Sequence, residues 1–318
     1  MRYFLVTGGA GFIGSNLIKN LLSDGNNHVI CLDNFDPFYS TDQKQENILP
    51  FKNHPNFEFS EGDIRDIDHL KTFGQIDVIV HLAAKAGVRQ SISQPELYFD
   101  VNVNGTQNLL NFAKERGIKQ FVFASSSSVY GINTNVPWNE HENLIPISPY
   151  ASTKLMGEFL GQTFSKLHEI RFIALRFFTV YGPGQRPDLA IHKFYKAIQN
   201  GDPISVYGDG STRRDYTFVD DTVQGILAAI DYRDSDFEII NIGNNRTVTL
   251  KELIKAIELS CGKKAVLNYV PEQEGDVPQT YADIRKASAL LDYHPNTKLQ
   301  EGLQAFANWL KQKETVPQ

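Results

Sequence analysis

The stretch from Ser148 to Lys154 places a tyrosine and a lysine four residues apart, a spacing that can support proton transfer. Ser148 suits the N-cap of a helix and Pro149 its first turn, so we expect a helix that begins here. Tyr150 and Lys154 would share one face of that helix. A neighbouring ammonium favours the phenolate, so we expect Lys154 to lower the pKa of Tyr150 toward that of a general base. Such a pair also occurs by chance on helix surfaces, and the rest of the chain must decide.

Three glycines, Gly8, Gly11 and Gly14, lie between an apolar strand-like run over 3–7 and an amphipathic helical pattern. Glycines at Gly8 and Gly11 would let the backbone approach a pyrophosphate, and Gly14 would let the helix pack closely on the strand. A second strand, expected over 28–32, ends in Asp33. A carboxylate there accepts hydrogen bonds from a ribose diol and repels a 2'-phosphate. The sequence therefore predicts NAD in preference to NADP.

Further short apolar runs alternate with helical patterns along the first half of the chain. Strands are expected over 57–59, 78–82, 121–124 and 172–176, and helices from Pro95 to Arg116 and from Ser148 to about His168. The segment 34–55 is expected to be a loop with a short helix. This alternation predicts an α/β fold, a Rossmann-type doubly wound parallel sheet, which binds ligands at the carboxyl ends of its strands. Small residues follow one such end, at Ala83 and Ala84, and hydroxyls follow another, at Ser125–Ser128.

Composition changes after residue 176, where proline, glycine and polar residues become more frequent. We expect residues 1–176 to form the NAD-binding domain, with part of 215–262 returning to it. Residues 177–318 would mainly form a smaller C-terminal substrate-binding lobe, whose last helix is expected over 299–313 with Leu303, Phe306 and Leu310 facing inward.

The overall composition of the 318 residues excludes several classes of function. The net charge of −6 gives no basic field for nucleic acid. Cys31 and Cys261 are expected to be reduced structural thiols, and the histidines show no metal-ligand spacing, so no metal is expected. No long apolar span or leader segment is visible, so we expect a cytoplasmic protein with no membrane role.

With the glycine turn, Asp33, the serine run and the Tyr150–Lys154 pair in this order, the chain resembles the extended short-chain dehydrogenase/reductase family. The resemblance is to its nucleotide-sugar epimerases and dehydratases, and it covers nearly the whole chain. It implies that Ser126, three residues before Val129-Tyr130-Gly131, is the catalytic hydroxyl, that Tyr150 is the base and that Lys154 is its partner. It also implies cofactor contacts along the chain: Gly8, Gly11, Phe12, Ile13, Gly14, Asp33, Asn34, Asp63, Ile64, Leu82, Ala83, Ala84, Lys85, Asn102, Tyr150 and Lys154.

The same resemblance implies a site for the nucleotide diphosphate of a sugar in the second half of the chain. The residues expected to bind substrate are Arg89, Ser127, Ser128, Thr179, Arg186, Arg214 and Asp276. Gln273 stands where several relatives carry an arginine. Relatives commonly pair through two long helices, here the one before Arg116 and the one after Ser148, so a homodimer is expected.

The neighbours of Ser126 indicate the reaction. Dehydratases of this family follow the catalytic hydroxyl with an Asp-Glu pair, and UDP-glucuronate decarboxylases keep a Glu before Val-Tyr-Gly. Ser127 and Ser128 replace these acids. The remaining reaction is 4-epimerisation, in which a sugar carbon is oxidised by NAD, the ketone turns, and the hydride returns to the other face.

The run from Arg176 to Ala190 resembles that of UDP-glucuronate 4-epimerases. Hydroxyls of Ser127, Ser128 and Thr179, with Arg186, could hold a C6 carboxylate through charge-assisted hydrogen bonds. A UDP-glucose or UDP-N-acetylglucosamine 4-epimerase stays open, since hydroxyl clusters also serve neutral sugars. A non-catalytic NAD-binding regulator is a more remote alternative, because such proteins commonly lose the tyrosine or the lysine.

Overall fold

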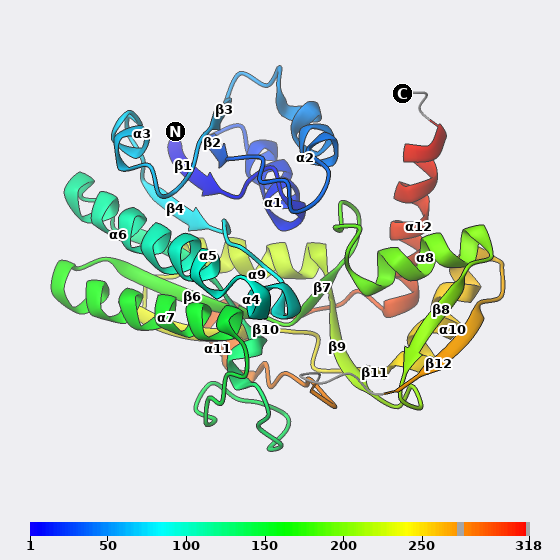
Figure 1. Ribbon diagram of the computed structural model, residues 1–318. Helices are drawn as coiled ribbons and strands as arrows, with labels where there is room; N and C mark the ends of the chain where they lie inside the picture. The colour runs from blue at the N-terminus through cyan, green and yellow to red at the C-terminus, as the bar shows by residue number, and fades with distance from the viewer. Residues whose placement is uncertain (272–276, 316–318) are drawn as a thin grey trace.

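A parallel sheet flanked by helices on both faces forms the centre of the protein (Figure 1). The structure, a computed structural model, describes residues 1–271 and 277–315. Within that part of the chain, seven parallel strands lie in the order β10 (Phe237–Ile242), β6 (Arg171–Phe177), β5 (Gln120–Ser126), β4 (Val78–His81), β1 (Arg2–Thr7), β2 (Asn27–Asp33) and β3 (Phe57–Glu61). The sequence-based prediction of a doubly wound α/β sheet is therefore confirmed.

Residues 1–177 supply six of these strands and the helices between them. The elements are β1 (Arg2–Thr7), α1 (Phe12–Ser23), β2 (Asn27–Asp33), α2 (Thr41–Ile48), β3 (Phe57–Glu61), α3 (Ile67–Lys71), β4 (Val78–His81), α4 (Val88–Ser93), α5 (Pro95–Phe99), α6 (Gly105–Arg116), β5 (Gln120–Ser126), α7 (Pro149–His168) and β6 (Arg171–Phe177). Short 3-10 helices follow α2 and β5, at Leu49–Phe51 and Ser127–Tyr130.

The second half of the chain completes the sheet and builds the smaller lobe. Its elements are β7 (Thr179–Tyr181), α8 (Ala190–Asn200), β8 (Pro203–Tyr207), β9 (Arg213–Phe218), α9 (Val219–Asp231), β10 (Phe237–Ile242), β11 (Thr247–Thr249), α10 (Leu250–Cys261), β12 (Val266–Val270), α11 (Arg285–Leu291) and α12 (Leu299–Thr315). Strands β11, β9 and β7 form one small sheet, and β12 pairs with β8 in another.

Alternating side chains of the central strands enter the apolar core on both faces of the sheet. Val6 and Val122 pack in one cluster with α1 and α9, whereas Leu5 and Phe121 pack in another with α6. Because successive residues of a strand point to opposite faces, a strand covered by helices on both sides must be apolar throughout. This explains the continuous apolar runs that identified the strands.

Helix α7 begins where the sequence predicted. The Ser148 hydroxyl accepts a hydrogen bond from the Ala151 amide, which caps the first turn. Two glycines let α7 lie against the sheet: a Cβ on Gly157 would come within 2.4 Å of the Phe123 ring, and one on Gly161 within 2.1 Å of the Phe172 ring. The close packing fixes α7 over β5 and β6, and thereby the position of Tyr150 at its first turn.

The helix expected from Pro95 to Arg116 forms, but it is not a single α-helix. A turn of π-helix over Asp100–Asn104 separates α5 from α6. π-Helical turns insert a residue and often mark functional sites. Here the turn contains Asn102, whose side chain bonds to the loop that follows β4 rather than to solvent.

Figure 1 shows β8, β12, α8, α10 and α12 gathered beside the carboxyl ends of the central strands. Strand β10 pairs with β6 in the central sheet and helix α9 packs against β5 and β6, whereas α10 packs on α8 and α12 in the lobe. The division at residue 176, with part of 215–262 returning, stays a prediction. The helix expected over 299–313 forms as α12, with Leu303, Phe306 and Leu310 buried. Over residues 1–271 and 277–315, no helix combines the length and apolar character needed to cross a bilayer.

Candidate active site

A cavity of about 520 Å³ opens at the carboxyl ends of β1, β2, β4 and β5. Residues from the glycine turn, the strand ends, α7 and the segment 177–189 line it. The predicted residues that it brings together are Gly8, Gly11, Phe12, Ile13, Gly14, Asp33, Asn34, Asp63, Ile64, Leu82, Ala83, Ala84, Lys85, Ser126, Ser127, Ser128, Tyr150, Lys154, Thr179 and Arg186. Ligand sites of this size and position are typical of open parallel sheets.

The glycine turn fits a pyrophosphate because its backbone leaves no room for side chains. Gly8 has a φ of +69°, and a Cβ there would lie 2.7 Å from the Ala83 amide nitrogen. A Cβ on Gly14 would lie 2.4 Å from the Gly8 carbonyl oxygen. The turn leads into the N-terminus of α1, where amide groups favour an anion.

Asp33 lies at the end of β2 and is held by three donors. Its carboxylate accepts hydrogen bonds from the amides of Ala10 and Phe35 and from Lys44 Nζ, at 3.2, 3.0 and 3.2 Å. Lys44 comes from α2 and is as deeply buried as Asp33. Sequence reasoning assigned no chemistry to this segment and missed Lys44. The sequence of a polar helix does not indicate which of its lysines is buried, so only the structure identifies Lys44 as a partner of Asp33.

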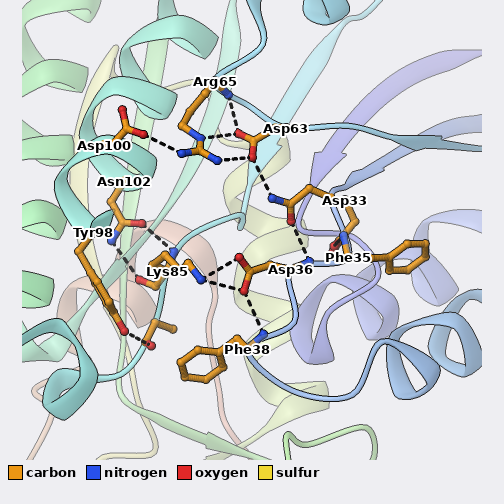
Figure 2. A network of polar contacts seen from close by, with 12 residues as sticks. Asp33, Phe35, Asp36, Phe38, Asp63, Arg65, Lys85, Tyr98, Asp100 and Asn102 are labelled. Carbon is orange, nitrogen blue, oxygen red and sulfur yellow. Dashed lines mark hydrogen bonds and ion pairs between the residues drawn. The ribbon is translucent and has the colours of Figure 1, made fainter. Parts of the chain in front are cut away.

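Asp63, at the end of β3, belongs to a second polar cluster (Figure 2). It accepts hydrogen bonds from Asn34 Nδ2 at 2.9 Å and from the amide, Nε and Nη2 of Arg65 at 2.9, 2.9 and 2.8 Å. The Arg65 guanidinium lowers the pKa of Asp63 to about 2. Asp63 is therefore ionised at neutral pH, and an amino group of a ligand would have to replace one of the four donors that it already has.

Ser126, Tyr150 and Lys154 meet where β5 ends beside the first turns of α7. The Ser126 hydroxyl accepts from the Ser128 amide and donates to the Ser128 hydroxyl, both at 3.1 Å. Lys154 is buried and donates to the Ala124 carbonyl at 2.7 Å. Burial without a carboxylate partner lowers the pKa of Lys154 to about 7.

The expectation that Lys154 lowers the pKa of Tyr150 is wrong. Burial raises the pKa of Tyr150, and the opposing effects come from the Ser126 hydroxyl and the charge of Arg186. Lys154 does not contribute because burial lowers its own pKa to about 7, which leaves it uncharged at the pH where a buried tyrosine titrates. Sharing a helix face brought both residues to the cavity, but burial determines the pKa of each.

The serine run and Arg186 form the other end of the cavity. Ser127, Ser128, Thr179 and Arg186 all line it. Arg186 is not unpaired, because its Nε and Nη2 donate to the Asp188 carboxylate at 2.9 Å each. Its guanidinium carbon also lies 4.9 Å from the centre of the Phe38 ring. Asp188 follows Arg186 by two residues, and nothing in the sequence indicated that the two side chains would pair.

Three predicted residues lie away from the cavity wall. Asn102 is buried behind it and bonds to the backbone of Lys85. Arg89 is exposed, with its guanidinium carbon 5.6 Å from the centre of the Tyr207 ring. Arg214, in β9, donates to the Arg213 carbonyl. Asp276 and Gln273 lie outside the described residues.

A metal centre is not visible among the residues that the structure describes. No group of three or more histidine, cysteine, aspartate or glutamate side chains is placed to bind an ion there. The expected absence of a metal stays a prediction.

Comparison with known proteins agrees with this geometry. The model of the NAD dependent epimerase/dehydratase family matches residues 4–243, which is more than half of the chain. The chain belongs to this family. The predicted family, and with it the dependence on NAD, is thereby confirmed.

Relatives within the NAD dependent epimerase/dehydratase family are similar over nearly their whole length. UDP-glucuronate 4-epimerase from Thermodesulfobacterium geofontis is 39% identical, over 98% of this chain and 97% of that protein. The crystal structure of UDP-glucuronic acid 4-epimerase from Bacillus cereus with UDP-glucuronic acid and NAD has a TM-score of 0.92 at 39% identity, covering 98% of this chain and 100% of that one. UDP-glucose 4-epimerase from Thermotoga maritima with UDP-glucose has a TM-score of 0.90 at 31% identity, with coverage of 98% and 100%.

Proposed function

We propose that the protein is an NAD-dependent UDP-sugar 4-epimerase that interconverts UDP-glucuronate and UDP-galacturonate. The observation that carries the proposal is that Ser126, Tyr150 and Lys154 share one cavity with the glycine turn, while Ser127 and Ser128 occupy the positions of the acids needed for elimination. Similarity to UDP-glucuronate 4-epimerases over nearly the whole chain supports the same reaction.

The residues of the cavity fit NAD. The glycine turn would hold the pyrophosphate, Asp33 and Asn34 the adenosine ribose, and Asp63 and Ile64 the adenine. Leu82, Ala83, Ala84 and Lys85, with Asn102 behind them, would form the wall around the second ribose and the nicotinamide. Bound NAD supplies a hydride acceptor, and its positive ring favours the phenolate of Tyr150.

The chain's own part in the reaction is proton transfer and positioning. Tyr150 takes the proton of the sugar's 4-hydroxyl as the carbon is oxidised, and returns a proton after the 4-keto sugar has turned. Ser126, which lines the same cavity as Tyr150, would turn its hydroxyl from Ser128 to donate a hydrogen bond to the same oxygen. Lys154, which lines the cavity, would hold the cofactor ribose through its ammonium.

The acid sugar is favoured by a guanidinium donor, Arg186, at the substrate end of the cavity. The Asp188 carboxylate accepts from Nε and Nη2 of Arg186, and among the described residues none accepts from Nη1, which could donate to a C6 carboxylate. Hydroxyls of Ser127, Ser128 and Thr179 would complete that contact. Because Asp188 already neutralises Arg186, a neutral sugar meets no unpaired cation, and UDP-glucose is the second candidate.

Arg214 and Asp276 are proposed to contact the uridine diphosphate, with Arg89 as a further cation near β8. We also propose a homodimer. Phe99 of α5 and Met156 and Phe159 of α7 are exposed on two helices that pack together, and apolar groups of this kind commonly mark protein interfaces. A cytoplasmic location is part of the same proposal.

Product analysis tests the function. UDP-glucuronate, UDP-glucose and UDP-N-acetylglucosamine are each incubated with the NAD-loaded protein and followed by NMR. We expect UDP-galacturonate with little pentose, and much slower reaction of the neutral sugars. Rapid formation of UDP-galactose beside inert UDP-glucuronate would assign the protein to the second candidate.

Two variants make the product test specific. Tyr150→Phe should retain NAD and lose at least about two orders of magnitude in turnover, the usual share of general acid–base catalysis. Arg186→Ala should lower kcat/KM for UDP-glucuronate about tenfold or more relative to UDP-glucose, if the charged hydrogen bond forms. Equal losses for both sugars would remove Arg186 from substrate selection.

A further inference from the structure

An ion pair joins the two loops that flank the glycine turn. Lys85 Nζ lies 2.9 Å from Oδ1 and 2.8 Å from Oδ2 of Asp36 (Figure 2). Asp36 follows β2 and Lys85 follows β4, and β1 lies between these strands in the sheet. The pair, which we call the Asp36–Lys85 bridge, therefore spans the crevice into which the glycine turn opens.

The bridge borders the cavity and is partly shielded from water. Asp36 and Lys85 both line the cavity. Their side chains are only 27% and 16% exposed, respectively. An ion pair in such surroundings is screened less than a fully exposed one and contributes more than a typical surface pair.

The lysine end of the bridge is anchored to the helix that carries Tyr150. The Lys85 amide donates to Asn102 Oδ1 at 2.8 Å, and Asn102 Nδ2 donates to the Lys85 carbonyl at 3.0 Å. The same Asn102 nitrogen lies 2.9 Å from the hydroxyl of Thr153, the residue before Lys154. The backbone of Lys85 thus has a fixed position relative to α7.

The aspartate end of the bridge is anchored toward the substrate end of the cavity. The Asp36 amide donates to Asn34 Oδ1, and Asp36 Oδ1 accepts from the Phe38 amide, both at 3.0 Å. The Phe38 ring in turn lies under the guanidinium of Arg186. Figure 2 shows that Asp36 and Lys85 turn their charged groups toward each other from opposite loops.

We propose that Asp36 is a positioning residue that holds Lys85 across the cofactor crevice, and that the bridge slows the release of bound NAD. This proposal rests on the proposed function, in which one NAD molecule must stay bound while the 4-keto sugar turns. Release of the dinucleotide would require the two loops to separate, and the ion pair opposes that separation. A bridge that merely ties two loops together would stabilise the fold without changing the release rate.

The experiment measures NAD release and needs no turnover. Protein loaded with NAD is diluted, and the NAD still bound is quantified over time after rapid gel filtration. Asp36→Asn keeps the shape of the side chain but removes its charge, and should release NAD about three- to thirtyfold faster. Asp36→Glu restores the charge and should bring the rate back toward that of the wild type.

Two further measurements distinguish the loss of the bridge from a general effect of removing a negative charge. Raising the salt concentration should speed release from the wild type and have a smaller effect on Asp36→Asn, because only the wild type has an ion pair to screen. Asp68→Asn removes the same charge from an exposed ion pair with Lys71, away from the cavity, and should release NAD at the wild-type rate. The salt dependence of the wild type can be measured even if a variant fails to fold.

An Asp36→Asn protein that releases NAD within twofold of the wild-type rate would overturn the proposal, as would equal salt dependence in the two proteins. Failure of the proposed function gives a different result. A wild type that holds NAD behind the bridge but converts no UDP-sugar would contradict the epimerase assignment and leave the bridge standing.

Discussion

At the scale of single residues, Tyr150 and Lys154 show what a spacing can and cannot predict. Because they are four residues apart on one helix, both side chains line the cavity, together with Ser126. The spacing did not predict that the ammonium would bond to Ala124, because that carbonyl belongs to β5 and meets α7 only in the folded chain. The raised pKa of Tyr150 follows from burial, which no spacing encodes.

Lys154 should make the stability of the cofactor-free protein depend on pH. Its pKa is about 7 in the fold, well below that of an exposed lysine. Between pH 7 and about 10 the unfolded chain therefore binds a proton that the folded chain has released, so Lys154 makes stability rise with pH by up to about 1.4 kcal/mol per unit. Urea unfolding of the wild type and Lys154→Met at pH 7, 8 and 9 measures this. The free energy of unfolding of the wild type should gain on that of the variant as the pH rises, and a constant difference would disprove the shift.

At the scale of elements, a buried ion pair joins α7 to the sheet. Arg176 of β6 donates to Glu158 of α7 at 2.9 and 2.8 Å, and both side chains are 2% exposed. The Ser125 hydroxyl of β5 donates to the same carboxylate. Glu158 lies one turn after Lys154, so this cluster fixes the helix that carries the reactive pair over the strand that carries Ser126.

Glu158→Gln should destabilise the protein severely. The change leaves the buried guanidinium of Arg176 without its counter-charge, at a cost of about 3–5 kcal/mol. Glu169→Gln is the control, because its ion pair with Lys119 is exposed and should contribute less than about 1 kcal/mol. Chemical unfolding of the three proteins compares them. Similar losses in both variants would show that burial of the pair does not determine its contribution.

At the scale of the whole molecule, the sequence predicted the sheet, its helices and most of the cavity wall. Apolar runs, glycines and a capped helix are local signals, and each formed the expected element. Lys44, Asp188 and Arg65 were missed because each matters through a partner that is distant or unmarked in the sequence. Lys44 pairs with Asp33, Asp188 pairs with Arg186, and Arg65 donates to Asp63. The two cysteines, Cys31 and Cys261, are free thiols, as the composition suggested.

The proposed dimer is tested on its exposed apolar helix face. Phe159 of α7 is 58% exposed in the single chain, which is unfavourable for a large aromatic side chain unless a partner covers it. We expect the wild type to sediment as a dimer and Phe159→Glu to shift it toward monomer, because a carboxylate would be buried in the interface. A wild type that sediments as a monomer at every concentration would refute the dimer.

Transfer of a deuterium label from carbon 4 tests the central claim most directly. UDP-glucuronate carrying deuterium at C4 is converted by the NAD-loaded protein in ordinary water, and the product is examined by NMR and mass spectrometry. Transient oxidation with return of the same hydride predicts UDP-galacturonate that retains deuterium at C4. Product in which solvent hydrogen has replaced the label, or no UDP-galacturonate at all, would contradict the account.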